Sequence, residues 1–345
     1  MNPRQFASDK ILNHPDRIQA WLNGENPFAV TMEIDPTNVC NHRCPGCSGW
    51  PIADKSSLSK ETMKAVIAEA KALGLRGLTF TGGGEPLCHP GTEWAVRFAA
   101  ECGLDVALIT NGSLLHKADM EGLIESCRWI RISLDAGTPG MHERVHGTSD
   151  FATIIRNIEK LVGVKHKTRS DCTIGVGYLT GAGTDDPEDM ADFVSMAVSL
   201  GVDYAQFRPF HTQAKKDLHR FKPIDWGMLE DMATTETEVL CSKHKYDAMV
   251  SGEVKRTYRE CYGHQFATTL CANGDMTICC HTRGLGWATL GNVNQQSVGQ
   301  IWNSKERMCA AGAIDLGKCP LLCRCNTFNE ILWRIKERKE HVNFL

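Results

Sequence analysis

The chain has 345 residues, of which 42% are hydrophobic and 23% are charged, a composition typical of a globular protein with one sizeable domain and a smaller one. The formal net charge is −3, so the chain has no excess of positive charge of the kind that binds nucleic acid or an anionic membrane. No apolar run is long enough to span a bilayer and no secretory signal is visible, so we expect a cytoplasmic protein without a membrane or nucleic-acid partner.

Sixteen cysteines stand out in this composition. In a reducing cytosol they indicate metal ligands and small buried hydrophobic residues rather than disulfide partners. Three of them lie at residues 40–47 and eight lie between Cys261 and Cys325. Metal chemistry is therefore expected in two separate parts of the chain.

Helices and strands are predicted to alternate along the first two thirds of the chain. A helical lead-in at residues 8–24, within an N-terminal segment of residues 1–29, precedes a strand at residues 30–35. The later strands are short and apolar and are predicted at residues 77–81, 106–110, 129–134, 172–179 and 204–207. The intervening helices are predicted after Ser59 and at residues 92–102, 117–126, 151–161 and 187–200.

This alternation predicts parallel βα units. Six units fit between residues 30 and 210, whereas a closed barrel needs eight. The predicted fold class is α/β, with a partial (β/α)6 TIM-like barrel over residues 30–225. A small cysteine-rich domain with a β-hairpin and a C-terminal helix is predicted over residues 226–345. Residues 268–280 predict the hairpin, with Asn273 and Gly274 as its two-residue turn.

The loop after the first strand carries Cys40, Cys44 and Cys47, spaced x3 and then x2. Three thiols this close can wrap one compact metal centre, and thiolates are the ligands that iron–sulfur clusters prefer. Zinc is the alternative, but it would need a fourth Cys or His nearby, and His42 is the only local candidate. A four-iron cluster held by three sulfurs would leave one iron open to another ligand.

Other unusual residues also follow directly after predicted strands. The glycine run of residues 82–84 with Glu85 follows the second strand, Asn111 the third, and residues 133–135 the fourth. In a β/α barrel these positions lie at the carboxyl ends of the strands, where active sites are built. Glycines let the backbone approach a ligand closely, so the glycine run beside a thiol cluster indicates a site for an amino group, with the Glu85 carboxylate at its rim. A plain strand-to-helix turn is the alternative.

Together these motifs resemble the radical S-adenosylmethionine (SAM) superfamily. The resemblance rests on the Cys-x3-Cys-x2-Cys loop, on Gly-Gly-Glu-Pro after the second strand, on Asn111-Gly112 and on the run from Ser133 to Arg144. It implies that Cys40, Cys44 and Cys47 hold a [4Fe–4S] cluster whose open iron binds the amino and carboxylate groups of SAM. Reductive cleavage of SAM would then give a 5′-deoxyadenosyl radical, with the electron supplied by a donor such as flavodoxin or ferredoxin.

The resemblance also implies which residues would bind the cofactor. Gly83, Gly84 and Glu85 would receive the SAM amino group, and Asn111 and Ser133 would make further polar contacts to the cofactor. The chain departs from the superfamily at Gly46, where an aromatic residue that packs near the adenine often precedes the third cysteine. We expect Trp50 or the strand at residues 176–178 to take that role.

The C-terminal cysteines resemble a shortened SPASM/twitch extension, which binds auxiliary [4Fe–4S] clusters. The resemblance implies one auxiliary cluster, held by Cys261 and Cys279 with two of Cys319, Cys323 and Cys325. The single-residue spacing between Cys323 and Cys325 departs from the family pattern. Cys271, Cys280 and Cys309 are interpreted as buried small residues or strand neighbours.

The substrate is the least determined feature of the sequence. Tyr178 and Arg208 lie at or near strand ends and could contact it, and Arg208 would suit a carboxylate or phosphate. About 30 residues precede the first strand, too few for a leader-peptide-binding domain. This favours a small sugar, aminocyclitol or nucleoside-type substrate undergoing oxidation, epimerisation or decarboxylation. The alternatives are a peptide or protein maturase, and a non-catalytic iron–sulfur carrier.

Overall fold

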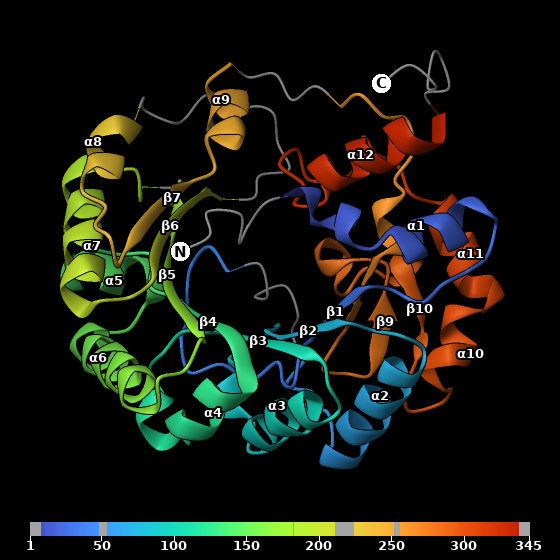
Figure 1. The fold of residues 1–345 in the computed structure, drawn as a ribbon, viewed down its shortest axis with the longest axis horizontal. Helices are drawn as coiled ribbons and strands as arrows, with labels where there is room; N and C mark the ends of the chain where they lie inside the picture. Colours follow the sequence, from blue (N-terminus) through green and yellow to red (C-terminus); the bar gives the residue numbers. More distant parts are fainter. Residues whose placement is uncertain (1–7, 48–53, 182, 211–223, 252–255, 338–345) are drawn as a thin grey trace.

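The computed structural model describes residues 8–47, 54–181, 183–210, 224–251 and 256–337. Its central feature is one ten-stranded sheet with the strand order β10-β9-β8-β1-β2-β3-β4-β5-β6-β7. The sheet curves so that the helices cover its outer face (Figure 1). Within the described part of the chain, no helix is both long and apolar enough to cross a membrane.

Seven parallel strands in sequence order form the barrel part of this sheet. They are β1 (Thr31–Ile34), β2 (Gly77–Phe80), β3 (Asp105–Thr110), β4 (Cys127–Ser133), β5 (Thr173–Thr180), β6 (Tyr204–Pro209) and β7 (Glu238–Cys241). The predicted partial barrel is therefore confirmed. Strand β7 was not predicted, because its four residues are too few for a clear pattern. β7 pairs with β6 although it follows residue 225, the predicted end of the barrel domain. The domain boundaries at residues 29/30 and 225/226 remain predictions.

Helices connect these strands on the outer face of the sheet. They are α2 (Lys60–Ala72), α3 (Thr92–Glu101), α4 (Met120–Ser126), α5 (Pro139–His146), α6 (Phe151–Thr168), α7 (Pro187–Leu200) and α8 (Trp226–Asp231); α9 (Lys243–Ser251) follows β7 and contacts β6. The helix start predicted at Ser59 is confirmed, because the Ser59 hydroxyl accepts a hydrogen bond from the Thr62 amide. Gly74 ends the same helix at a φ of +99°, a conformation that favours glycine.

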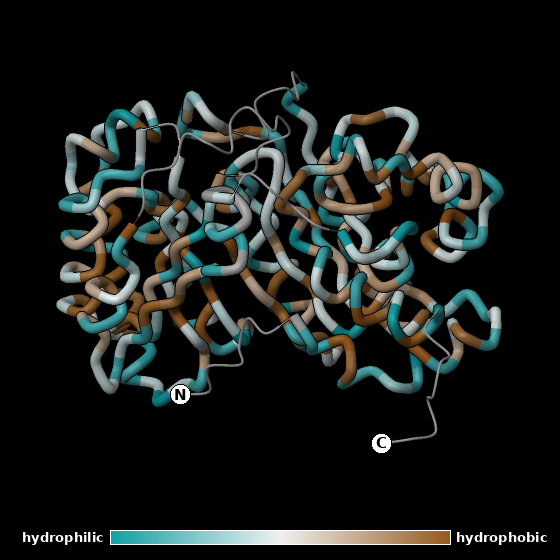
Figure 2. Tube along the Cα trace, turned by 90° about the horizontal axis from the view of Figure 1, so that it is seen from above, coloured by the Kyte–Doolittle hydropathy of each residue, from teal (hydrophilic) through white to brown (hydrophobic). Residues whose placement is uncertain are grey.

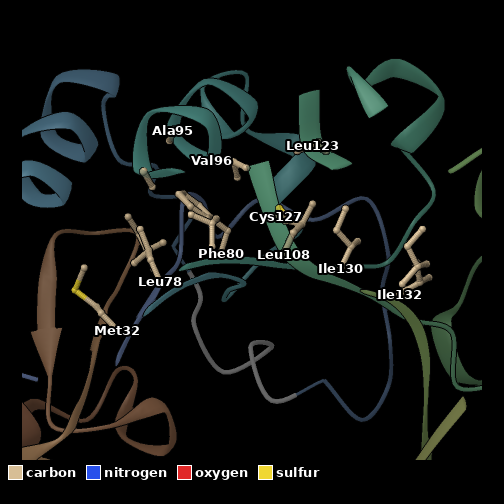
Figure 3. Close-up of a cluster of buried hydrophobic side chains, with 14 of the residues drawn as sticks. Met32, Leu78, Phe80, Ala95, Val96, Leu108, Leu123, Cys127, Ile130 and Ile132 are labelled. Carbon is tan, nitrogen blue, oxygen red and sulfur yellow. The ribbon is translucent and has the colours of Figure 1, made fainter. Parts of the chain in front are cut away.

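Hydrophobic side chains fill the space between the strands and the helices. In Figure 3, Phe80, Leu108 and Ile130 point from three neighbouring strands toward Val96 of α3 and Leu123 of α4. Alternate residues of a strand point to opposite faces, so the residues between these positions face the concave side of the sheet. Figure 2 shows the same arrangement as hydrophobic segments within the body of the molecule and hydrophilic segments on its outer turns.

The C-terminal region continues the sheet rather than standing apart from it. Its strands are β8 (Ala267–Leu270), β9 (Asp275–Thr277) and β10 (Thr289–Asn292). β8 runs parallel to β1, and β9 pairs antiparallel with β8 on one side and with β10 on the other. The predicted hairpin is confirmed, with Gly274 in its turn at a φ of +90°. The thiols after this hairpin are thereby fixed relative to β1.

Five further elements pack at the β10 end of the sheet. They are the 3-10 segment η2 (Ser8–Asn13), α1 (Pro15–Leu22), α10 (Val298–Trp302), α11 (Lys305–Gly312) and α12 (Asn326–Glu337). A second apolar cluster joins the N-terminal and C-terminal helices and includes Trp21, Tyr262, Phe266 and Leu332. The helical lead-in is therefore packed against the cysteine-rich region (Figure 1).

Candidate active site

The loop with Cys40, Cys44 and Cys47 leaves the carboxyl end of β1. Its backbone is turned by a hydrogen bond from the Cys47 amide to the Cys44 carbonyl, 3.1 Å long. The His42 amide lies 3.4 Å from the Cys40 sulfur. Cys40 and Cys47 are exposed and Cys44 is half-buried, so the loop presents its thiols outward from β1.

The glycine run after β2 lies directly against this loop. The Gly84 amide donates to the Thr37 carbonyl at 3.0 Å, and the Glu85 amide donates to the Val39 carbonyl at 3.0 Å. A Cβ atom at Gly84 would lie 2.2 Å from the Val39 carbonyl oxygen, a distance that no side chain can occupy. Glycine at position 84 is therefore what allows the two loops to approach this closely.

The Glu85 side chain turns inward, which corrects the predicted position of its carboxylate at the rim. It is 3% exposed and accepts hydrogen bonds from the Thr110 hydroxyl at 2.6 Å, the Asn111 amide at 2.7 Å and the Leu87 amide at 3.1 Å. Burial raises the pKa of Glu85, although these three donors act against the shift. Its carboxylate ties the end of β2 to the end of β3.

Asn111 continues this connection to the cysteine loop. Its side-chain amide donates to the Asn41 side chain at 2.9 Å, and its oxygen accepts from the Ser113 amide at 3.0 Å. Asn41 in turn donates to the Ser113 hydroxyl at 2.7 Å. Asn41, which the sequence analysis did not single out, thus links the cysteine loop to β3.

Three histidines meet at the cysteine loop, His42 from the loop itself and His142 and His146 from α5. His146 of α5 places Nδ1 3.1 Å from the Cys44 sulfur and Nε2 2.9 Å from the Leu134 carbonyl oxygen. His42 and His142 each contact one oxygen of Asp150, at 3.0 Å and 2.9 Å. No role was predicted for His142 or His146, and the helix that carries them, α5, was not predicted either.

Ser133 is the last residue of β4 and lies in register with Gly177 of β5. Asp135, two residues later, has a φ of +51°, which is rare for a residue with a side chain. Its carboxylate accepts from the Leu179 amide at 2.7 Å and lies 3.7 Å from His146 Nε2. These contacts connect the ends of β4 and β5 to the histidines at the cysteine loop.

An aromatic ring lies beside Gly46, but it does not come from either predicted segment. A Cβ atom at Gly46 would lie 2.9 Å from the ring of Phe210, which follows β6. Trp50 lies outside the described residues. Phe210 occupies the space that the absence of a side chain at Gly46 leaves open. The sequence alone could not show this contact, because it depends on how the sheet curves to bring the end of β6 near the cysteine loop.

The two predicted substrate contacts lie on opposite faces of the sheet. Tyr178 is fully buried on the helix side, where its hydroxyl donates to Asp189 of α7 at 2.9 Å and its ring packs on Phe193. The predicted substrate contact of Tyr178 is therefore wrong, since its side chain points away from the barrel interior. Arg208 follows the outward-facing Phe207 and so lies on the concave side.

The C-terminal thiols also gather in one region. The thiol of Cys323 interacts electrostatically with those of Cys261, Cys279 and Cys319. Hydrogen bonds from the Cys325 thiol, and then from His281, hold the pKa of Cys323 well below its usual value. The five predicted auxiliary residues therefore lie in one neighbourhood.

Cys280 lies in the same region. Its interpretation as a small buried residue or a strand neighbour did not predict this position among the other thiols. Its side chain is hydrogen-bonded to His281, and the Arg324 guanidinium stabilises its thiolate. Cys271 is buried and Cys309 is exposed. A thiolate-rich region with adjacent cations fits an anionic iron–sulfur cluster.

The donor atoms of the first loop fit a cluster better than a single ion. Among the described residues, two groups of three possible ligands lie within 4.8 Å of one another: His42 with Cys44 and His146, and His42 with His142 and Asp150. The three loop cysteines form no such tight group. A single zinc ion would need them closer together, whereas a four-iron cluster separates its sulfur ligands more widely.

Comparisons with known proteins agree with this site. Residues 34–194 match the Radical SAM superfamily, and residues 261–327 match the SPASM iron–sulfur cluster-binding domain. The AdoMet-dependent heme synthase of Methanosarcina barkeri is 22% identical over 303 residues, which cover 81% of this chain and 83% of that protein. A probable GTP 3′,8-cyclase of Thermococcus kodakarensis is 25% identical over 48% of this chain and 53% of its own length.

Peptide-modifying enzymes are also similar. The PqqA peptide cyclase of Methylobacterium nodulans is 32% identical over 54% of this chain and 48% of its own length. Among solved structures, Streptococcus suis SuiB bound to S-adenosylmethionine matches with a TM-score of 0.65 and 16% identity, over 86% of this chain and 71% of SuiB. At this identity the structural match shows the fold alone.

The fold and the two thiol-rich regions define an iron–sulfur enzyme of the radical SAM class. The chain belongs to the radical SAM superfamily and carries a C-terminal SPASM domain. Its cofactors are SAM and [4Fe–4S] clusters, and this chemistry requires an electron donor.

Proposed function

We propose that this enzyme abstracts a hydrogen atom from a small-molecule substrate of sugar, aminocyclitol or nucleoside type, leading to oxidation, epimerisation or decarboxylation. The observation that carries the proposal is the contact of the Gly84 backbone with the cysteine loop at Val39. This contact brings the glycine run, the proposed site for the amino group, next to the cysteine loop. When bound, the reduced cluster and SAM would supply a 5′-deoxyadenosyl radical, and the protein excludes competing hydrogen donors.

Each cofactor-binding residue has a proposed role that follows from its position. Cys40, Cys44 and Cys47 would hold the first cluster. The backbone of Gly83 and Gly84 would receive the SAM amino group. Glu85 would act by fixing the Asn111 loop rather than by direct contact, since its carboxylate is already bonded to three donors.

Further contacts to the cofactor would come from the ends of β4 and β6. Ser133, at the carboxyl end of β4, would contact the SAM carboxylate or ribose. Phe210 would pack near the adenine, because it lies against Gly46 next to the third cysteine. These two residues would orient the cofactor across the carboxyl ends of the strands.

The auxiliary cluster is proposed to be bound by Cys261 and Cys279 with two of Cys319, Cys323 and Cys325. Cys280 is a further candidate, because it shares His281 with Cys323. Such a cluster would accept an electron from a substrate radical or hold the substrate region in shape. We also propose a cytoplasmic location and a flavodoxin or ferredoxin as the electron donor.

Two findings bear on the choice of substrate class. The match to the heme synthase covers most of both chains, which supports a small molecule. The match to the PqqA peptide cyclase is higher in identity but covers about half of each chain. A peptide maturase that installs a thioether or carbon–carbon crosslink is therefore the second candidate.

A direct test is an anaerobic incubation of the reconstituted enzyme with dithionite, SAM and a deuterated metabolite extract. A deuterated peptide fraction is incubated in parallel. Mass spectrometry should find deuterium in 5′-deoxyadenosine after incubation with the metabolite extract, and none after incubation with the peptide fraction. Deuterium transfer from the peptide fraction alone would contradict the small-molecule proposal and favour the maturase. Stoichiometric loss of SAM would indicate oxidation, and recycling of SAM would indicate isomerisation.

A further inference from the structure

Arg131 of β4 and Arg208 of β6 lie together on the concave face of the sheet. Ile130 and Ile132, the neighbours of Arg131, point toward the helices (Figure 3). Phe207, the neighbour of Arg208, packs on the helix side against Phe193. Since side chains alternate along a strand, both arginines point into the barrel.

The two guanidinium groups converge over Gly177 of β5, the strand between them. A Cβ atom at Gly177 would lie 3.8 Å from Arg131 Nε and 3.8 Å from an Arg208 Nη atom. Glycine at this position leaves the space above β5 to the two arginines. Gly177 is also in register with Ser133, so the arginines adjoin the proposed place of the cofactor carboxylate.

Both arginines lack an ionic partner among the residues that the structure describes. No carboxylate of this part of the chain lies within 4.0 Å of either guanidinium, and both Nε atoms are buried without a hydrogen-bond partner in it. The contact from Arg131 to the Gln206 side-chain oxygen is long, at 3.5 Å. Two half-buried cations without an ion pair in the described residues therefore lie side by side.

The nearby carboxylates are already engaged elsewhere. Glu33 is paired with Arg283 and Arg324, and Asp35 is paired with Arg283. Asp135 attracts both Arg131 and Arg208, but its oxygens are bonded to the Leu179 amide and face His146. Burial, and then repulsion from Arg131, lowers the pKa of Arg208 to about 9, as expected for a cation that lacks a counterion.

We propose that Arg131 and Arg208 bind one oxyanion of the substrate, a carboxylate or a phosphate group. This inference rests on the proposed function and narrows it to an anionic small molecule. A guanidinium binds such groups through two parallel N–H bonds, and two guanidiniums together neutralise the charge that burial makes unfavourable. The bound anion would fix the rest of the substrate beside the cofactor.

Calorimetric titration of the reconstituted, SAM-bound enzyme tests the site without turnover. The probes are inorganic phosphate and malonate, which represent the two sources of the oxyanion. Wild type should bind at least one of them saturably, and Arg131→Gln and Arg208→Gln should each weaken that binding about 10-fold or more, because a charge-assisted bond is lost. Preference for phosphate or malonate would identify the group.

A matched control comes from the same strand. Arg128 of β4 is exposed and pairs on the surface with Asp105, so Arg128→Gln should leave anion binding unchanged. Arg208→Lys keeps the positive charge but cannot donate two parallel N–H bonds. Its affinity for the anion should therefore lie between those of wild type and Arg208→Gln. Circular dichroism and the thermal transition of each variant show whether it is folded, and the Arg208→Lys result keeps the test decisive if one glutamine variant does not fold.

Three results would overturn the proposal: no saturable binding of either probe by wild type, equal binding by all variants, or loss of SAM affinity in place of anion affinity. The last result would assign the arginines to the cofactor. The proposed function is tested separately by SAM cleavage. An enzyme that cleaves SAM but binds no anion refutes this inference alone, and one that binds anions through these arginines but cleaves no SAM refutes the proposed function alone.

Discussion

His146 Nδ1 lies 3.1 Å from the sulfur of Cys44, while Nε2 of the same ring lies 2.9 Å from the Leu134 carbonyl oxygen. Because a carbonyl can only accept, Nε2 carries a proton and the ring is fixed between β4 and the cysteine loop. The Arg43 amide also donates to the His146 carbonyl at 3.1 Å, so the backbone of α5 holds the same loop. A residue 102 positions away thus orients a proposed cluster ligand.

Replacing His146 should weaken retention of the first cluster. Partners that orient metal ligands typically contribute 10-fold to 100-fold in metal affinity, so His146→Ala should retain iron about 10-fold less well against a chelator. His146→Gln, which can still bond Leu134, should recover part of that loss. The measurement is iron release followed by absorbance under anaerobic conditions. Equal release from His146→Ala, wild type and the exposed control His166→Gln would contradict this role.

The contact of Gly84 with the cysteine loop gives a second prediction. Gly84→Ala places a Cβ atom 2.2 Å from the Val39 carbonyl, so one of the two backbones must move. We expect a loss of about 1–3 kcal/mol in the free energy of unfolding and weaker SAM binding. Denaturant unfolding and equilibrium dialysis measure the two effects.

Gly163→Ala is the matched control for this substitution. A Cβ atom at Gly163, on the exposed face of α6, meets nothing within 4 Å, so this change should stabilise the helix by about 0.5–1 kcal/mol. Unaltered SAM affinity in Gly84→Ala would show that the close approach of the loops does not shape the cofactor site.

The buried ion network at Glu33 predicts a pH dependence of stability. Burial alone would raise the pKa of Glu33, but Arg324 and Arg283 outweigh it and lower the pKa to about 2. Glu33→Gln should cost about 3–5 kcal/mol at pH 7, because the carboxylate is buried and Arg283, itself mostly buried, loses a partner. The exposed control Glu159→Gln should change stability by less than about 0.5 kcal/mol.

The sign of the shift fixes the pH window. A carboxylate with a lowered pKa stabilises the fold above its ordinary pKa of 4.5, and that contribution disappears as the pH falls toward about 2. The difference in unfolding free energy between wild type and Glu33→Gln should therefore shrink between pH 4.5 and 2. A difference that stays constant through this range would show that the ion pairs are not its source.

The C-terminal thiols should contribute about half of the bound iron. Reconstituted wild type is expected to hold about eight irons, and Cys279→Ala about four, since a four-iron cluster is lost with its ligand. Exposed Cys309 lies on α11, and Cys309→Ala should leave the count unchanged. Iron and sulfide analysis decides this, and about eight irons in Cys279→Ala would remove Cys279 from the ligand set.

Sequence patterns revealed those parts of the fold that depend on local chemistry. The helix start at Ser59, the glycine hairpin turn at Gly274 and the order of the parallel strands follow from residues close together in the chain. The parallel pairing of β8 with β1 could not be predicted, because it joins residues more than 200 positions apart. The four-residue strand β7 was too short to show a period.

The same division holds for the site: its local motifs were predictable from the sequence, and its contacts between distant residues were not. The cysteine loop and the glycine run were found from their spacing, and the structure brings them together. The outward direction of Tyr178 depends on the exact register of β5, and a shift of one residue reverses the face. Phe210 beside Gly46, and His146 beside Cys44, are contacts across the barrel that no local pattern encodes.

The central claim is that the cysteine loop and the glycine run form one site at which SAM is reductively cleaved. Its most direct test measures 5′-deoxyadenosine formed under anaerobic conditions with dithionite and SAM, by wild type and by the triple variant Cys40→Ala/Cys44→Ala/Cys47→Ala. Wild type and the control Cys102→Ala, at the end of α3, should both form it, and the triple variant should form none while retaining the C-terminal iron. Undiminished 5′-deoxyadenosine from the folded triple variant would contradict the claim.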